Sequence, residues 1–231
     1  MVLIWQALID LLETILNFFY QFVGDYGIAI ILLTVVVRAV LLPLTLKQTK
    51  SMHELQKVQP KLKEVQAKYK DDKEKLHKEL MKLYSEHKIN PFGGCLPLLL
   101  QSPIFIALFQ MLSKQEALKS PTILGLSDLS KTAGSFKLGA DLGLALPYYV
   151  LIILMAVSSY IPTKMMTADP QQSRMMLFME AFLIFVAWQL PAGILVYWTT
   201  FNLLTIAQQY VTMRTKREVG KQKQNGAHAK S

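Results

Sequence analysis

Residues 26–46 read YGIAIILLTVVVRAVLLPLTL, an apolar run that contains one charged side chain, Arg38. An α-helix rises about 1.5 Å per residue and the hydrocarbon core of a bilayer is about 30 Å thick, so about 20 apolar residues span it. The run therefore predicts a membrane-spanning helix. It also places a cation inside that helix, about 12 Å from the end at Leu46.

The composition of the whole chain is typical of a membrane protein. Of its 231 residues, 52% are hydrophobic and 18% are charged, whereas soluble domains are about one quarter charged. The single cysteine, Cys95, excludes an internal disulfide framework and a multi-cysteine metal site. Because the chain also has no phosphate-binding loop and no zinc-protease motif, we expect no cofactor, no metal and no enzymatic activity.

Four further apolar segments are long enough to cross a bilayer, and with residues 26–46 they predict an all-α protein of five transmembrane helices. These segments are residues 95–112, 144–163, 175–190 and 192–212. They are joined by an outer loop over residues 113–143, by a cytoplasmic loop over residues 163–174 and by a tight corner at Pro191.

The distribution of Lys and Arg predicts the orientation of the chain. These residues number 12 in the connection 47–90 and 6 after residue 212, against none in residues 1–25. Positively charged loops stay on the cytoplasmic side of a membrane. We therefore expect the N-terminus outside and the C-terminus in the cytoplasm.

Residues 1–25 form a separate amphipathic segment. Its polar residues fall within one 100° stripe of a helix: Gln6, Asp10, Glu13, Thr14, Asn17 and Gln21. We expect this helix to lie in the outer interface of the membrane. The alternative is a sixth span, against which the two acidic residues near its start argue.

The connection 47–90 predicts a basic helical hairpin on the cytoplasmic side. Apolar residues at steps of three and four give each arm a narrow seam: Leu55, Val58, Leu62, Val65 and Tyr69, then Leu76, Leu80 and Leu83. Five residues of the hairpin are candidates for docking a substrate or a ribosome: Lys57, Pro60, Lys61, Lys68 and Lys73. The alternative is a solvated face, or one held to anionic lipid.

Residues 213–231 are basic and polar, and we predict a disordered cytoplasmic tail. Arg214, Lys216 and Arg217 would attract lipid headgroups or ribosomal RNA, because attraction to phosphate does not depend on sequence.

Arg38 requires an explanation, because a cation inside a span costs roughly 2.5–3.5 kcal/mol on insertion scales. We expect it to face a water-filled cavity; the alternatives are a salt bridge with Glu180 and snorkelling to the interface. Four other residues at span depth are candidates for lining the cavity: Gln101, Gln189, Trp198 and Asn202. Interhelical hydrogen bonds are the alternative role, and for Trp198 a place in the interfacial aromatic belt.

Several stretches, taken in order, resemble the YidC family of membrane protein insertases, which is related to the mitochondrial Oxa and chloroplast Alb proteins. The resemblance covers about residues 20–212 and is highly specific because a charged hairpin follows the first span. The matching stretches are VRAVLLPL at 37–44, Gln59-Pro60-Lys61, NPFGGCLP at 90–97, Gln101-Ser102-Pro103-Ile104, Pro191-Ala192-Gly193, Tyr197-Trp198 and Asn202.

The resemblance implies five spans around a hydrophilic groove that is closed to the outside and open to the cytoplasm and to lipid. Arg38 matches the groove arginine of the family. The implied function is insertion of nascent membrane proteins into a bacterial plasma membrane, in contact with lipid, the ribosome and the Sec translocon.

Two departures from the family pattern bear on this expectation. The sequence has no large outer domain before the first span and no lipobox cysteine, which predicts a compact form of the family. Where some relatives have a glutamine near the end of the third span, this chain has Ser158-Ser159-Tyr160, so no groove role is assigned there.

Two other functions fit parts of the sequence. A small transporter would use Arg38 to bind an anionic solute, although the internal repeat common in transporters is not visible. A structural membrane anchor would present the hairpin as a binding module. An anchor predicts that Arg38 is replaceable without loss of function.

Overall fold

The computed structural model is helical, and it describes residues 2–87, 96–114, 118, 122–136, 141–166 and 170–228. Within these residues there is no strand, only one isolated bridge between Thr132 and Pro191. The helices are α1 (Val2–Val23), α2 (Tyr26–Lys68), α3 (Lys73–Glu86), α4 (Leu96–Lys114), η3 (Ala133–Ser135), α5 (Leu142–Met166), α6 (Pro170–Ala187) and α7 (Ala192–His228). The all-α fold class expected from the sequence is confirmed.

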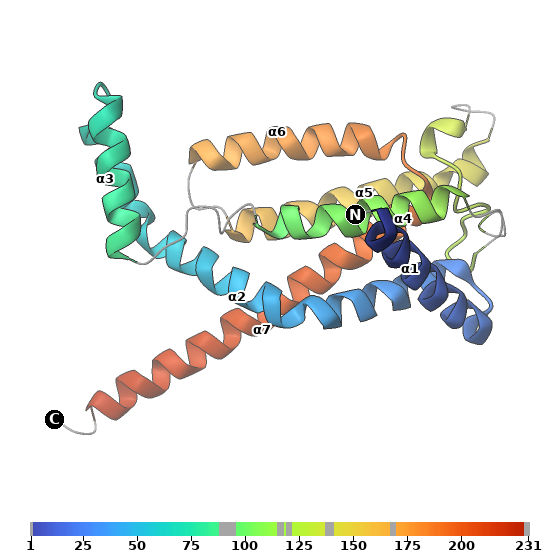
Figure 1. Cartoon of the computed structure of the whole chain (residues 1–231), viewed down its shortest axis with the longest axis horizontal. Coiled ribbons are helices and arrows are strands. Elements are labelled where there is room, and N and C mark those ends of the chain that lie inside the picture. Colours follow the sequence, from blue (N-terminus) through green and yellow to red (C-terminus); the bar gives the residue numbers. More distant parts are fainter. Residues whose placement is uncertain are drawn as a thin grey trace.

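The longest helix, α2, joins the first apolar run to the first arm of the hairpin without a break (Figure 1). It has 43 residues and is therefore about 65 Å long, twice the thickness of the hydrocarbon core. Gly24 turns the chain between α1 and α2 with a φ of 67°. Asp25 then caps α2, because its side chain accepts a hydrogen bond from the Ile28 N–H.

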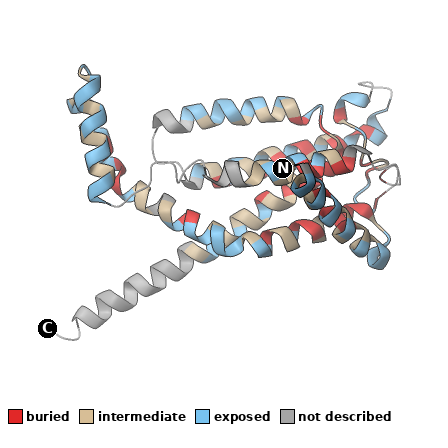
Figure 2. Cartoon of the chain, in the orientation of Figure 1, coloured by how far each residue is buried: buried red, intermediate tan, exposed pale blue. Residues whose placement is uncertain are grey.

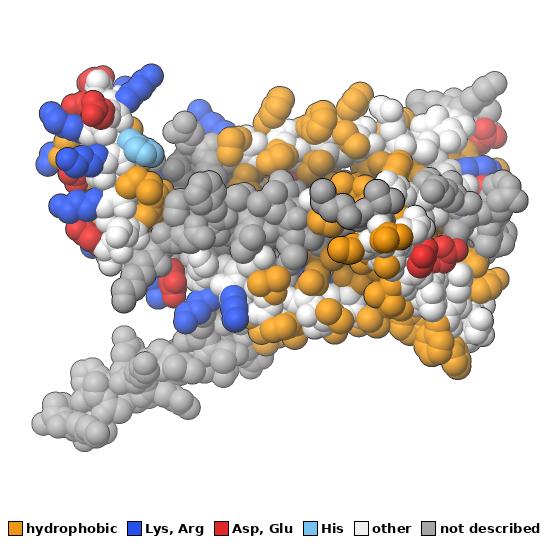
Figure 3. Space-filling model, viewed as in Figure 1, with side chains coloured by type: hydrophobic (Ala, Val, Ile, Leu, Met, Phe, Trp, Pro, Cys, Tyr) orange, Lys and Arg blue, Asp and Glu red, His pale blue; other side chains and the backbone are white. Residues whose placement is uncertain are grey.

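The helical bundle has a small core and an apolar outer surface. Helix α7 packs on α5 and α2, α1 packs on α2 and α4, and α6 packs on α5 (Figure 1). Buried residues concentrate where the helices meet (Figure 2), whereas many apolar side chains are exposed on the face of the bundle that Figure 3 shows. Phe178 and Phe185 of α6 are 78% and 66% exposed. Such a surface is suited to lipid contact.

Three of the described helices are long and apolar enough to cross a membrane, namely those at Leu3–Val23, Tyr26–Lys68 and Leu142–Lys164. A shorter apolar helix covers Gln101–Leu112. The prediction of five spans is therefore neither confirmed nor excluded. Length and composition also do not separate the two alternatives for α1, which were an interfacial helix and a sixth span.

The hairpin consists of the second half of α2 and the antiparallel α3, which project from the bundle (Figure 1). Val58 and Leu62 are buried in its seam, and they pack against Leu55, Leu80, Leu83 and Tyr84. Asp72 caps α3 by accepting a hydrogen bond from the Lys75 N–H at 3.0 Å. Burial raises the pKa of the Tyr84 phenol.

At the other end of the bundle, backbone hydrogen bonds tie the loop 122–136 to the turn between α6 and α7. The N–H groups of Ala192 and Gly193 donate to the carbonyls of Lys131 and Leu129, each at 2.9 Å. The Gly134 N–H donates to the Trp188 carbonyl at 3.2 Å. These bonds hold the loop over this end of the bundle.

Helix α7 continues to His228, which differs from the disordered tail predicted from residue 213. The physical reason is composition: this stretch has no proline and is rich in Lys, Arg and Gln, all good helix formers. The side chains of Arg214, Lys216 and Arg217 lie outside the described residues, so their predicted role in binding lipid or RNA stays a prediction.

Candidate functional site

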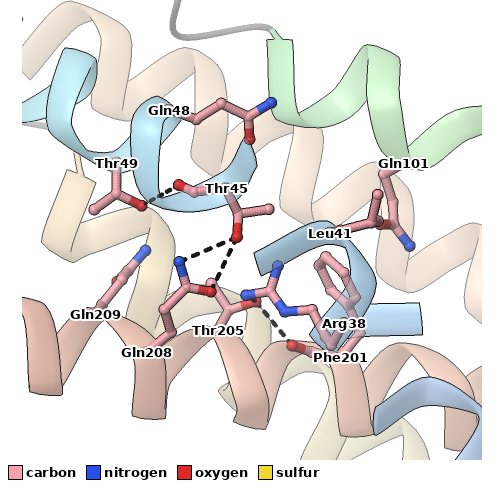
Figure 4. Close-up of a pocket in the computed structure, with 10 residues that line it drawn as sticks. All are labelled: Arg38, Leu41, Thr45, Gln48, Thr49, Gln101, Phe201, Thr205, Gln208 and Gln209. Carbon is pink, nitrogen blue, oxygen red and sulfur yellow. Dashed lines mark hydrogen bonds between the residues drawn. The ribbon is translucent and has the colours of Figure 1, made fainter. Parts of the chain in front are cut away.

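A polar cavity of about 90 Å³ lies between α2 and α7, with one wall residue from α4 (Figure 4). Its volume is enough for several water molecules. We call it the α2–α7 cavity; its lining residues are Arg38, Leu41, Thr45, Gln48, Thr49, Gln101, Phe201, Thr205, Gln208 and Gln209. Eight of the ten are polar or charged, which is unusual inside a bundle with an apolar exterior.

Arg38 is buried on the wall of this cavity, with 8% of its surface exposed. Its Nη2 donates a hydrogen bond to Thr205 Oγ1 at 2.9 Å. Its guanidinium carbon lies 4.4 Å from the centre of the Phe201 ring, a favourable cation–π geometry. In the described part of the chain the one ion pair joins Lys75 and Asp72, so Arg38 has no carboxylate partner there.

Short polar side chains connect α2 to α7 beside the arginine. Gln208 Nε2 donates to Thr45 Oγ1 at 3.2 Å, and Thr205 Oγ1 donates to the Phe201 carbonyl at 2.8 Å. The Gln208–Thr45 bond joins the two helices, whereas the Thr205–Phe201 bond lies within α7 and orients the Thr205 hydroxyl (Figure 4). The polar wall is therefore pre-organised around the guanidinium.

Gln48 and Gln209 are the exceptions on this wall, because each has an unused polar atom. Both are 5% exposed. Among the described residues, Gln48 Nε2 and Gln209 Oε1 have no hydrogen-bond partner. The cavity therefore has unsatisfied hydrogen-bonding capacity as well as charge.

Gln101 is the predicted groove residue that the structure places beside Arg38. It comes from α4, lines the cavity and donates a hydrogen bond to the Tyr197 hydroxyl of α7. Tyr197 is itself almost completely buried. The pair therefore links α4 to α7.

Asn202 and Trp198 do not line the α2–α7 cavity. Asn202 Nδ2 donates to Ser159 Oγ of α5 at 2.6 Å and lies 3.4 Å from Ser158 Oγ. Trp198 packs edge-to-face on Phe105 of α4, with ring centres 5.4 Å apart. Asn202 therefore joins α7 to α5 through hydrogen bonds, the alternative role noted for it from the sequence, whereas Trp198 packs α7 against α4.

Gln189 and Glu180 also lie away from Arg38. Gln189 is exposed in the turn after α6. Glu180 of α6 lies beside Ser159 of α5, and its Oε1 is buried without a hydrogen-bond partner among the described residues. No ion pair joins it to Arg38 in this part of the chain.

The five hairpin candidates are all exposed. Lys57 and Lys61 lie at a second hollow, of about 250 Å³, which Glu54, Val58 and His87 also line. The Lys61 Nζ lies 3.4 Å from His87 Nε2. Pro60, Lys68 and Lys73 do not line this hollow. Their docking role stays a prediction.

Six polar residues that line the cavity were not among the predicted groove residues: Thr45, Gln48, Thr49, Thr205, Gln208 and Gln209. A signal for them exists in the sequence. Starting at Arg38, the lining residues of α2 recur at steps of three or four, a spacing that keeps them on one helix face. Gln48 and Thr49 were missed because they lie beyond the apolar run 26–46.

Comparison of the sequence with known proteins identifies the family of this chain. The model of the family described as "60Kd inner membrane protein" matches residues 18–220. "Membrane protein insertase YidC" of Pelobacter propionicus is 42% identical over 197 residues, which are 84% of this chain and 36% of that protein. The protein of the same name from Geotalea daltonii is 40% identical over 208 residues, 89% of this chain and 37% of that one.

A solved structure has the same fold. It is titled an active YidC insertase crystal structure with the first transmembrane domain resolved, and it matches with a TM-score of 0.70 and 29% identity. The match covers 89% of this chain and 46% of that one. The chain spans little more than a third of the length of the two curated relatives. It belongs to the 60Kd inner membrane protein family, the family of the YidC insertases.

Proposed function

We propose that this chain is a membrane protein insertase, not an enzyme, that moves nascent hydrophobic helices with short polar outer segments from the cytoplasm into the bilayer. Its relatives carry the name insertase. The observation that carries the proposal is Arg38, a buried cation on a polar cavity wall with no carboxylate partner among the described residues. A cation kept in this state is available to an anionic ligand.

The barrier to insertion is the polar segment of the substrate, not its apolar helix. An unpaired charge at the centre of a bilayer costs at least about 2.5 kcal/mol. The α2–α7 cavity offers water and hydrogen-bonding groups part of the way across, and Arg38 attracts an acidic side chain into it. Both effects lower the barrier without any covalent chemistry.

The free energy for insertion comes from the substrate and from the membrane. Each CH₂ group that leaves water contributes about 0.8 kcal/mol. The membrane potential contributes up to about 2.3 kcal/mol per charge and per 100 mV. The apolar surfaces of α5 and α6 then guide the substrate helix to lipid.

The topology and the partners are part of the same proposal. The chain lies in a bacterial inner membrane with five spans, its N-terminus outside and its C-terminus in the cytoplasm. Helix α1 lies at the outer interface. The basic hairpin and the basic tail contact the ribosome, with ribosomal RNA contacts in the tail, and the protein works alone or beside the Sec translocon.

The test is insertion of a single-span substrate with a short acidic outer segment into proteoliposomes, scored by protease protection. Wild-type protein should insert it, and Arg38→Ala at equal abundance should insert it at least about tenfold more slowly. Arg174→Ala removes an exposed arginine of α6 and is the matched control. If Arg38→Ala inserts as well as wild type, the charged-cavity mechanism is wrong. If neither wild-type protein nor Arg38→Ala inserts the substrate, the insertase proposal is wrong and the transporter and the membrane anchor are the functions left to test.

A further inference from the structure

Gln48 and Gln209 face the same cavity from opposite helices, and each has an atom without a partner. Gln48 Nε2 is an unused donor on α2, and Gln209 Oε1 is an unused acceptor on α7, within the described part of the chain. Both side chains are 95% buried, since each is 5% exposed. Buried polar atoms are nearly always hydrogen-bonded, because leaving them unpaired is costly. The two atoms therefore mark a place for a ligand.

Neighbouring side chains on the wall are already engaged. The Thr49 hydroxyl donates to the Thr45 carbonyl at 2.9 Å. Gln208 and Thr45 are bonded to each other at 3.2 Å. The unused atoms are thus not the halves of a pair with these neighbours, and the group that satisfies them comes from outside the fold.

A peptide group has the chemistry that these two atoms require. It presents one carbonyl acceptor and one N–H donor, which point to opposite sides of a trans peptide unit. Carboxylates and lipid phosphates offer mainly acceptors, and an ammonium group offers only donors. Each of those leaves one glutamine unsatisfied. Peptide groups are also present in every substrate, whatever its side chains.

The distance to Arg38 fits one short segment. Gln48 follows Arg38 by ten positions on the same helix, which is about 15 Å along its axis. An extended chain covers that distance in about four to five residues, at about 3.3 Å each. The acidic side chain and the bound peptide group then belong to one extended stretch of the substrate.

We infer that Gln48 and Gln209 bind the backbone of the translocating segment while it is extended. Gln48 Nε2 donates to a backbone carbonyl of the substrate, and a backbone N–H of the substrate donates to Gln209 Oε1. The inference rests on the proposed insertase function. Arg38 contacts the charge of an acidic side chain. The two glutamines add a second contact, to the backbone, which does not depend on the sequence of the substrate.

The test compares cavity variants of the protein on two substrates in the proteoliposome assay, and the readout is the initial rate of insertion. One substrate has an ordinary short acidic outer segment. The other has proline at every non-acidic position of that segment, and proline has no N–H. The protein variants are Gln48→Met and Gln209→Met, which keep side-chain length, and Gln21→Met, which changes an exposed glutamine of α1, is the control.

With the ordinary substrate, each cavity variant should slow insertion roughly threefold to tenfold, the effect of one lost hydrogen bond. With the proline substrate, Gln48→Met should still slow insertion, because proline keeps its carbonyl. Gln209→Met should have no further effect there, because the N–H is already missing. Wild-type protein should insert the ordinary substrate faster than the proline substrate, because only the ordinary one has the N–H. Gln209→Glu keeps an acceptor oxygen, so it should show the same preference and provides a test even if Gln209→Met does not fold.

Two results overturn the inference. Wild-type rates for both methionine variants would mean that the two atoms bind only water. The second result has two parts: Gln209→Met slows both substrates equally, and Gln209→Glu no longer inserts the ordinary substrate faster than the proline substrate. It would mean that Gln209 acts without a substrate N–H. Failure of wild-type protein to exceed empty liposomes is a different outcome, because it refutes the proposed function itself.

Discussion

Arg38 of α2 donates a hydrogen bond to Thr205 of α7 at 2.9 Å, and this neutral hydroxyl stands where a buried cation usually has a carboxylate. The Phe201 ring, 4.4 Å from the guanidinium carbon, is also neutral. Neither contact cancels the charge. The site is therefore held in place by neutral groups while its positive charge stays available, which is the condition for attracting an acidic segment.

Replacing Arg38 separates charge from geometry. Arg38→Ala should lower the insertion rate of an acidic-tailed substrate about tenfold or more, the effect of losing a hydrogen bond to a charged group. Arg38→Lys keeps the charge but not the planar fork, so it should retain an intermediate rate. A substrate with a neutral tail is the control and should respond weakly to both. Equal loss in Lys and Ala variants would show that guanidinium geometry, and not charge alone, is required.

Thr205 should act by positioning Arg38. Thr205→Val has nearly the same shape but no hydroxyl, and it should reduce insertion of the acidic-tailed substrate about fivefold, corresponding to about 1 kcal/mol. Thr205→Ser keeps the hydroxyl and should restore most of the rate. The measurement is the initial rate for acidic-tailed and neutral-tailed substrates. A loss that is equal for both substrates would indicate a packing defect in place of a positioning role.

Replacing Glu180 tests whether it forms a salt bridge with Arg38, the alternative that the sequence left open. Because no ion pair joins Glu180 to Arg38 among the described residues, Glu180→Gln should leave acidic-tailed insertion within about twofold of wild type, less than the effect of one hydrogen bond. A true buried pair would behave otherwise, since removing one partner typically costs about 3–5 kcal/mol. Thermal unfolding in detergent checks stability at the same time. A large loss in both assays would contradict the placement seen here.

Local patterns in the sequence predicted the helices well because membrane spans and amphipathic arms have strong signals. The apolar spacing in the hairpin selected five residues that pack in its seam, Leu55, Val58, Leu62, Leu80 and Leu83, but not Tyr84, which packs there as well. The run over residues 26–46 likewise lies within α2. These features depend on neighbours along the chain, and so composition and period are sufficient to find them.

The site was harder to predict because it depends on how helices pair. Arg38 was identifiable alone, since a charge inside an apolar run is conspicuous. Gln189 has the same chemistry as Gln209, but the turn after α6 leaves it exposed, whereas the extension of α7 buries Gln209 against α2. Only the pairing of α2 with α7 distinguishes these two glutamines.

Asp25 joins the start of α2 to the loop 122–136, and its loss should open this end of the bundle. One carboxylate oxygen accepts the Ile28 N–H at 2.9 Å, and the other accepts the Ile123 N–H at 2.6 Å. Asp25→Ala removes the cap and the loop contact, and should destabilise the protein by about 1–3 kcal/mol. Asp25→Asn keeps one acceptor oxygen and a good cap residue, so its effect should be smaller.

The readout for this end of the bundle is thiol labelling of Ser127→Cys in a Cys95→Ser background, together with thermal unfolding in detergent. Asp25→Ala should speed labelling, because the loop that carries residue 127 loses its hydrogen bond to Asp25. Asp10→Ala is the matched control: its carboxylate accepts an exposed bond from Gln6 at 2.9 Å, and surface contacts of this kind contribute little. Unchanged labelling in Asp25→Ala would mean that the backbone bonds between the loop and the α6–α7 turn close this end without Asp25.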